Sequence, residues 1–196
     1  MPEYKIYLGI VSSLIASLAY IPYLRDIFKG KTKPHVFSWF LWGLLGAITF
    51  SAQIIRGAGA GSWSNGITAL ICFVIVTLSF KRWDRKMSRF DWLAFLGALL
   101  GLVLWGLTDN PLWAVVLAVI VDTLAYSLTF RKAYHKPYEE TMIYFIMATI
   151  GTIISLFALE IYNPVTWLYP VCLVVSNSLF IAMLSARRRI LAGRKN

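Results

Sequence analysis

Asp122 is the residue of this chain with the clearest chemical potential, because it stands in the middle of the apolar stretch 112–130. An ionised carboxylate at membrane depth costs at least about 3 kcal/mol, so such a residue faces an internal cavity or has a partner. Tyr126 follows one helical turn later on the same face and is a natural partner. Two interpretations stay open: Asp122 is a proton or cation site coupled to solute movement, or it is a neutral acid that holds helices together.

Asn177 is the second candidate, since it lies near the middle of the last apolar stretch with Ser176 and Ser178 on either side. Buried amides commonly form hydrogen bonds between the helices of membrane bundles, and this role alone explains the residue. A role for Asn177 and Ser176 in solute binding is the alternative.

Tyr20 and Tyr126 occupy related positions in the two halves of the chain. An aromatic wall with a polar tip suits sugars and other polyhydroxylated solutes, although ordinary helix packing explains both residues equally well. Gln53 and Asn65 stand nearer the ends of their apolar stretches, where they could line the entrance to a solute site.

Pro22 and two tryptophans are candidates for residues that take part in a conformational change. A proline inside a helix removes a backbone donor and kinks the helix, so Pro22 is a candidate hinge. Trp39 and Trp42 are one turn apart near the start of the stretch 36–55. We interpret them first as anchors at the membrane interface and second as an inner gate.

These residues belong to seven apolar stretches that are long enough to cross a membrane. The chain of 196 residues is 59% hydrophobic and 14% charged, whereas roughly a quarter of the residues in a soluble domain are charged. A membrane-spanning helix needs about 20 apolar residues. The sequence therefore predicts an all-α integral membrane protein with helices at 6–24, 36–55, 63–80, 90–107, 112–130, 141–159 and 164–186.

Positive charge lies almost entirely on one side of these stretches. Of the 19 Lys and Arg residues, 17 fall in connections that share one face, and only Lys5 and Arg56 fall on the other. Basic residues stay on the cytoplasmic side of a membrane, so we expect the N-terminus outside and the C-terminus in the cytoplasm. The net charge of +10 then reflects orientation and contact with anionic lipid, and it predicts no nucleic-acid partner.

Several protein classes are excluded by what the stretches lack. No lysine lies within them to bind retinal, and only one carboxylate and no histidine is buried, so we expect neither a photoreceptor nor an enzyme. Neither a nucleotide-binding motif nor a signal-peptide cleavage site is present. Cys72, Cys172, His35 and His135 lack the spacing of a disulfide framework or a metal site, and we expect no cofactor.

The two halves of the chain echo each other at an offset of 106 residues, because Tyr20 recurs as Tyr126 and Arg25 as Arg131. The first three and last three stretches would each begin outside and end inside, with the fourth stretch inverting the chain between them. The sequence therefore predicts two parallel three-helix repeats, residues 1–82 and 110–196, joined by a linker helix in residues 83–109.

Local motifs accompany this organisation at residues 20–23 (Tyr-Ile-Pro-Tyr), 26–27 (Asp-Ile) and 30–34 (Gly-Lys-Thr-Lys-Pro), followed by Ser38-Trp39. With the three-one-three pattern, they make the chain resemble the SWEET and PQ-loop transporter superfamily over its full length. The Pro-Gln pair of that family is Pro22-Tyr23 here, and Leu128-Thr129 stands in the second repeat. The resemblance implies alternating access and places an asparagine of a third helix, here Asn177, in the central solute site.

We therefore expect a membrane transporter for a small polar, sugar-like solute, either a uniporter or proton-coupled through Asp122. A carrier of vitamin precursors or amino acids with the same architecture stays open, as does a seven-helix cargo receptor that moves no solute. The expected partners are the solute and the lipid bilayer, and assembly into homo-oligomers is open.

Overall fold

The structure is a computed structural model that describes residues 3–55, 63–80, 87–159 and 162–193. Regular secondary structure within these residues is entirely helical, which confirms the all-α prediction. The elements in chain order are α1 (Glu3–Phe28), α2 (Val36–Ile55), α3 (Trp63–Phe80), α4 (Arg89–Gly106), α5 (Pro111–His135), the 3-10 turn η2 (Pro137–Glu139), α6 (Met142–Ala158) and α7 (Pro164–Gly193).

Three helices run beyond the apolar stretches that predict them. α1 passes through Pro22 without a break in the helix, and α5 and α7 continue past residues 130 and 186 into charged sequence. A helix satisfies its backbone hydrogen bonds internally whether its side chains are apolar or charged. Hydropathy therefore marks the apolar part of each helix, and the charged turns extend it.

Four helices are long and apolar enough to cross a membrane, and they indicate a membrane protein by length and composition. They are Tyr4–Phe28 in α1, Arg89–Gly106 in α4, Pro111–His135 in α5 and Pro164–Gly193 in α7. The apolar parts of α2, α3 and α6 within the described residues are shorter, at Val36–Ile48, Gly66–Phe80 and Met142–Ala158.

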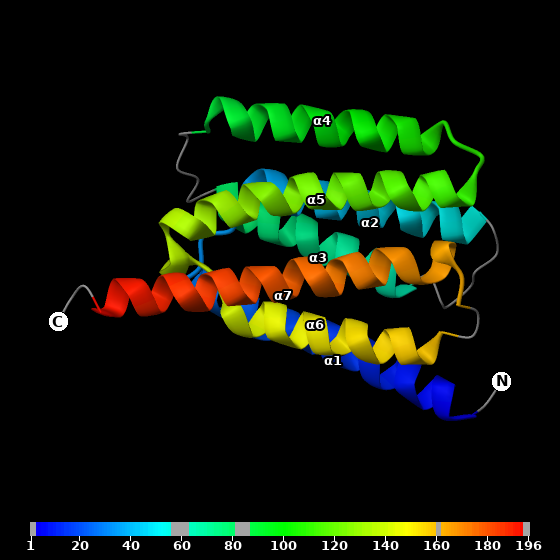
Figure 1. The fold of residues 1–196 in the computed structure, drawn as a ribbon, viewed down its shortest axis with the longest axis horizontal. Helices are drawn as coiled ribbons and strands as arrows, with labels where there is room; N and C mark the ends of the chain where they lie inside the picture. The colour runs from blue at the N-terminus through cyan, green and yellow to red at the C-terminus, as the bar shows by residue number, and fades with distance from the viewer. Residues whose placement is uncertain (1–2, 56–62, 81–86, 160–161, 194–196) are drawn as a thin grey trace.

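The helices lie roughly along one common axis (Figure 1). Six of them form a closed ring in which the packing order is α1, α3, α2, α5, α7, α6 and back to α1. α4 lies outside this ring, against α5 and to a smaller extent α2. The start of α1 and the end of α7 lie at opposite ends of the bundle (Figure 1).

Most of the described basic residues gather at one end, where α1, α3, α5 and α7 finish and α2, α4 and α6 begin (Figure 1). We call this the basic end. Lys5 is the one described Lys or Arg at the opposite end, where its Nζ donates to the carbonyl of Leu159. Arg56 lies outside the described residues. The described part of the chain thus keeps the charge asymmetry that its sequence predicts.

Local capping signals set several helix boundaries at these ends. Gly30, at φ 71°, ends α1 in a left-handed turn, and the N–H of Lys31 donates to the carbonyl of Asp26. Ser88 and Asp91 form a capping box at the start of α4. Asn110 caps α5 just before a proline, where the missing N–H is harmless.

The contact between α4 and α5 fixes the outlying helix to the ring. At the basic end, Nη1 of Arg131 lies 2.6 and 2.8 Å from the two carboxylate oxygens of Asp91. Farther along, Gly101 faces the fully buried Val121, and a Cβ at Gly101 would lie 2.8 Å from Cγ2 of that valine. A Cβ at Gly97 would lie 3.5 Å from Leu124, an ordinary contact.

We predict that Gly101→Ala is less stable than Gly97→Ala by about 1–3 kcal/mol, the typical cost of overpacking a core. Both substitutions raise helix propensity equally, so their difference isolates the clash with the stiff, β-branched Val121. Unfolding of the two variants in detergent, followed by circular dichroism, measures this difference. Equal stability would show that α4 does not pack on α5 as described.

Candidate functional site

The middle of the ring holds a cluster of polar side chains from three helices. Nε1 of Trp42 on α2 donates to Oδ1 of Asp122 on α5 at 2.9 Å, and Asp122 is only 5% exposed. The side chain of Tyr169 on α7 also lies near the same carboxyl. Asp122 therefore faces the interior of the bundle, as its place in an apolar stretch predicts.

Tyr126 and Asn177 complete this central cluster. The hydroxyl of Tyr126 donates to Oδ1 of Asn177 at 2.5 Å, and both residues are buried. The ring of Tyr126 also packs against that of Trp42, with centroids 5.0 Å apart. The structure thus brings together four of the residues that sequence analysis singles out, and we define the central cluster as Trp42, Asp122, Tyr126, Tyr169 and Asn177.

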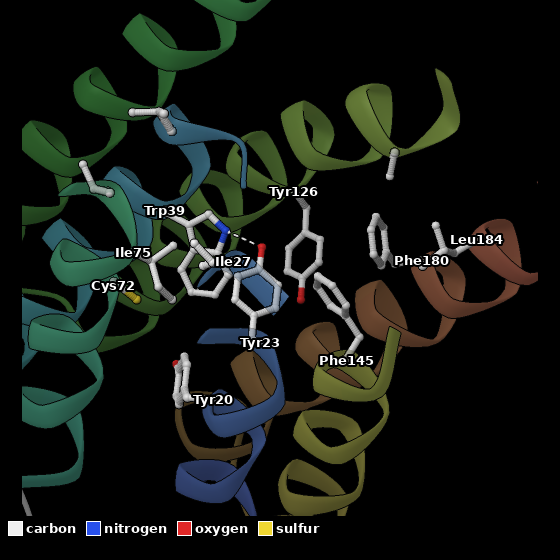
Figure 2. Packing of buried hydrophobic residues seen from close by; sticks show 13 residues of the cluster. Tyr20, Tyr23, Ile27, Trp39, Cys72, Ile75, Tyr126, Phe145, Phe180 and Leu184 are labelled. Carbon is white, nitrogen blue, oxygen red and sulfur yellow. Dashed lines mark hydrogen bonds between the residues drawn. The ribbon is translucent and has the colours of Figure 1, made fainter. Parts of the chain in front are cut away.

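A layer of aromatic rings lies between the central cluster and the basic end. Nε1 of Trp39 donates to the hydroxyl of Tyr23 at 3.0 Å, and the two ring centroids are 4.7 Å apart (Figure 2). Tyr144 packs against the rings of Trp39 and Tyr23, with centroids 5.6 and 5.0 Å apart, and the ring of Tyr20 packs at a tilt against Tyr144, with centroids 5.2 Å apart. We call Tyr20, Tyr23, Trp39 and Tyr144 the aromatic layer.

The interpretation of Trp39 as an interfacial anchor is wrong, because its side chain is 1% exposed and its N–H is bonded inside the bundle. Trp42 is half-buried and bonded to Asp122, so it too points inward. Both indoles can be buried because each N–H has an oxygen acceptor inside the bundle, the hydroxyl of Tyr23 for Trp39 and the carboxyl of Asp122 for Trp42. The role of a gate for these two residues stays a prediction.

A buried ion pair lies on the basic side of the aromatic layer. Glu140, with a fully buried side chain, accepts from Nζ of Lys132 at 2.7 Å and from the hydroxyl of Tyr23 at 3.2 Å. Burial raises the pKa of the Glu140 carboxyl above its usual range, against the opposing effect of Lys132. Nη2 of Arg188 on α7 donates to the Glu140 carbonyl at 2.6 Å. This Glu140 hub joins α1, α5 and α7.

A second set of polar contacts ties the α1–α2 connection to the segment before α6. The hydroxyl of Thr141 bonds that of Thr32 and donates to Asp26 at 3.1 Å. Lys33 pairs with Glu139 at 2.6 Å, and its N–H also donates to the carbonyl of Glu139. The two connections therefore hold the basic end of the ring together.

The half of the bundle away from the basic end contains a pocket of about 230 Å³ between α1, α3 and α6. The side chain of Thr68, which lines this pocket, lies near that of Tyr20, so the pocket borders the aromatic layer. Six of its eight lining residues carry hydroxyl groups, and we call it the hydroxyl pocket. The six are Ser12, Ser13, Ser17, Thr68, Thr152 and Ser155.

The remaining predicted site residues are not part of the central cluster. Tyr20 belongs to the aromatic layer and is 8% exposed. Ser176 is half-buried next to Asn177. The side chains of Gln53 and Asn65 lie outside the described residues. Among the residues that the structure describes, no group of His, Cys, Asp and Glu could hold a metal ion.

Glu140, Tyr144 and Tyr169 are members of these networks that sequence reasoning missed. Glu140 stands next to Glu139 in a connection, where a carboxylate is expected to be solvated. A signal was nonetheless present, since Glu140 immediately precedes the apolar stretch 141–159 and lies close in sequence to basic residues. The two tyrosines resemble ordinary apolar-stretch aromatics until the partners of their hydroxyls are known.

Comparison with protein-family models, curated proteins and solved structures finds no match for this chain. The SWEET and PQ-loop resemblance therefore rests on the sequence features alone, and the function is argued from the site itself.

We predict that Lys132→Met lowers the free energy of unfolding by about 3–5 kcal/mol, because it leaves the buried Glu140 carboxylate without its countercharge. Lys33→Met is the matched control, since its pair with Glu139 is partly exposed and contributes no more than about 1 kcal/mol. Thermal unfolding in detergent measures both, and adding Glu140→Gln to Lys132→Met should recover most of the loss.

The loss of unfolding free energy in Lys132→Met should depend on pH. Because burial raises the pKa of Glu140, the folded state binds this proton more tightly than the unfolded state, and the carboxyl stabilises the fold less as pH rises. The defect of Lys132→Met is therefore expected to shrink as pH falls from about 8 to about 5, toward the ordinary pKa of Glu. A defect of constant size would contradict a buried, ionised Glu140.

Proposed function

We propose that this chain is a membrane transporter for a small, uncharged polar solute, which binds at the central cluster and crosses by alternating access. The two moving units are the proposed three-helix repeats, residues 1–82 and 110–196, with residues 83–109 as their linker. The observation that carries the proposal is the central cluster itself. Hydrogen-bonding groups from α2, α5 and α7 converge in the interior of an apolar bundle, at the junction of both units.

The chemistry of the central cluster favours an uncharged polar solute. The described donors and acceptors are an indole N–H, tyrosine hydroxyls, an amide and one carboxyl, and no Lys or Arg lies among them. Rings of Trp42 and Tyr126 supply flat apolar walls beside these groups. Such a combination suits a solute that carries hydroxyl or carbonyl groups on a compact carbon skeleton, as sugars do.

The packing order of the ring supports two equivalent units. In each proposed triplet the third helix lies between the other two, as α3 does between α1 and α2, and α7 between α5 and α6. The contacts between triplets also correspond, since α1 packs on α6 and α2 packs on α5. Exchanging the triplets converts one contact into the other, as a pseudo-two-fold axis requires.

The distribution of polar contacts supports alternating access. The Glu140 hub and the aromatic layer close the path from the central cluster to the basic end. The hydroxyl pocket lies on the other side of that layer, in the half of the bundle away from the basic end. We infer an outward-facing arrangement, in which the basic end is the cytoplasmic side, α1 starts outside and α7 ends inside.

Moving the solute inward requires the basic end to open. The contacts that would separate are those between the units, chiefly Tyr23 with Glu140 and Lys33 with Glu139. Pro22 lies immediately before Tyr23, where a kink in α1 would act directly on these contacts. Trp39 and Tyr144 would part with them and serve as the inner gate.

The test is uptake into liposomes that contain the purified protein, with a panel of sugars, nucleosides, amino acids and vitamin precursors. We expect uptake of at least one such solute, and Asn177→Leu should lower it about tenfold or more, because a lost buried hydrogen bond costs about 1–3 kcal/mol. Ser178→Ala, on the exposed side of α7, is the control and should keep uptake within about twofold.

Absence of flux with every solute would refute the transporter. Saturable binding of a peptide without flux would instead favour the cargo receptor, and uptake of an amino acid or a vitamin precursor alone would reassign the substrate class.

Proton coupling through Asp122 is tested separately. Asp122→Asn keeps an oxygen acceptor for Nε1 of Trp42 but removes the titratable group. An inward proton gradient should accelerate uptake by the wild-type protein, and this acceleration should vanish in the variant while downhill uptake persists. Thr123→Ala, whose exposed hydroxyl bonds only its own helix, is the control. An unchanged response to the gradient in Asp122→Asn would leave Asp122 with a purely structural role.

A further inference from the structure

A second cavity, of about 290 Å³, lies at the basic end. Its walls come from the α1–α2 connection, the end of α3, the start of α4 and the end of α5, so it lies beside the junction of α4 with the ring. Ligand pockets commonly measure about 300–1,000 Å³, which puts this cavity at the small end of that range. Neither the central cluster nor the hydroxyl pocket contributes to its lining.

Positive charge exceeds negative charge in the lining of this basic-end cavity. Among the residues that the structure describes, the charged lining residues other than histidine are Lys33, Arg131, Lys132, Lys136, Asp91 and Glu139, which leaves two positive charges in excess. Glu140, bonded to Lys132 but not itself in the lining, reduces the excess to one. The carboxylate of Asp26 is also near, since Thr141 bonds both it and Thr32 of the lining, but Asp26 is itself paired with Arg25. Counted over the described residues, the cavity therefore keeps a positive excess, which favours anions.

The pairing geometry leaves donors for an anion. Arg131 reaches both oxygens of Asp91 through one nitrogen, Nη1, and its other guanidinium nitrogens make no hydrogen bond to the described residues. Its side chain is 43% exposed, and that of Lys33 is 48% exposed, so both can swing toward a ligand. A guanidinium fork beside lysine ammonium groups matches the oxygens of a phosphate group.

Buried His35 lies on the same wall, with Nε2 3.9 Å from Asp91. Burial lowers the pKa of His35 to about 4, and this outweighs the opposite pull of Asp91. The imidazole is therefore neutral at pH 7 and neither adds to nor subtracts from the positive excess.

The lining also has an apolar part, made of Ile27, Pro34, Val36, Leu78 and Met87, and two hydroxyl residues, Thr32 and Ser79. Because charged residues form one part of the wall and apolar residues another, the cavity suits an anionic group attached to an apolar or glycerol-like body better than a bare ion. The cavity also lies at the ends of apolar helices, where the headgroups of a bilayer would be.

We propose that the basic-end cavity is a binding site for a phosphate-type anion, carried either by a phospholipid headgroup or by a soluble phosphate compound. The site is separate from the central cluster, although it shares Lys33, Glu139 and Lys132 with the contacts that close the basic end. Binding there can be measured whether or not the protein moves a solute. An anion held between Lys33 and Arg131 bridges the α1–α2 connection and α5, so binding stabilises the closed basic end.

The experiment has two arms, one for each source of the phosphate group. In detergent, thermal unfolding is compared in inorganic phosphate and in chloride at equal ionic strength. In vesicles of equal parts phosphatidylcholine and phosphatidylglycerol, the lipid that stays bound after gentle solubilisation is counted by native mass spectrometry. We expect a higher unfolding temperature in phosphate, or retention of about one phosphatidylglycerol per chain in preference to phosphatidylcholine.

Two double variants distinguish binding in the cavity from general attraction of anions to the positive charge of the basic end. Lys33→Gln with Lys136→Gln removes two charges from the lining and should weaken phosphate or lipid binding about tenfold, the effect of two partly exposed charge contacts. Lys29→Gln with Lys31→Gln removes the same charge from the same end but outside the lining, and should keep binding.

A phosphate response identifies a soluble ligand, and selective lipid retention identifies a headgroup. The wild-type protein alone can overturn the proposal, by showing neither response. Equal weakening by both variant pairs would also overturn it, because binding would then reflect the general charge of the basic end.

Discussion

The ion pair between Glu140 and Lys132 is the interaction on which the basic end of this protein depends. A buried carboxylate is tolerated only with a close countercharge and with hydrogen bonds to its remaining lone pairs. Lys132 supplies the first and Tyr23 the second, and Tyr23 in turn accepts from Trp39. A single carboxylate thereby fixes side chains from α1, α2 and α5, and its backbone carbonyl holds α7 through Arg188. These elements meet here because Glu140 has no other way to satisfy its charge.

The central cluster follows a different rule, because its groups are mostly neutral. Trp42 and Tyr126 each offer one hydrogen bond from an otherwise apolar ring, so burying them costs little once a partner is found. Neutral partners exchange more readily than a buried ion pair does. The strong electrostatic contact therefore lies at the basic end, and the weaker, more exchangeable contacts lie in the central cluster, where the proposed solute would bind.

Sequence reasoning predicted the helices well because hydropathy and helix caps are local properties. Gly30, Ser88 and Asn110 set boundaries that can be located from a few neighbouring residues. The inward position of Asp122 was predictable for the same reason, since one buried carboxylate has few tolerable environments. The proposed three-one-three organisation requires seven membrane spans. The described apolar parts of α2, α3 and α6 are shorter than a span, so their lengths alone do not establish it.

Prediction failed where a residue's environment comes from a distant part of the chain. Trp39 has the composition and position of an interfacial anchor, and only the acceptor on Tyr23 draws it inward. Glu140 is an ordinary loop carboxylate until the fold brings Tyr23 to it across 117 residues of sequence. Neither partner is visible in a local pattern, because tertiary packing decides which polar groups find each other.

The position of α4 outside the ring has a mechanical consequence. Its contacts are mainly with α5, through Gly101 and the Arg131–Asp91 pair, and only secondarily with α2. If the two proposed triplets rock against each other, α4 moves together with the second triplet (α5, α6 and α7) and displaces lipid as it moves. The second triplet then displaces more lipid than the first, so the thickness and fluidity of the surrounding bilayer would affect its movement more than that of the first triplet.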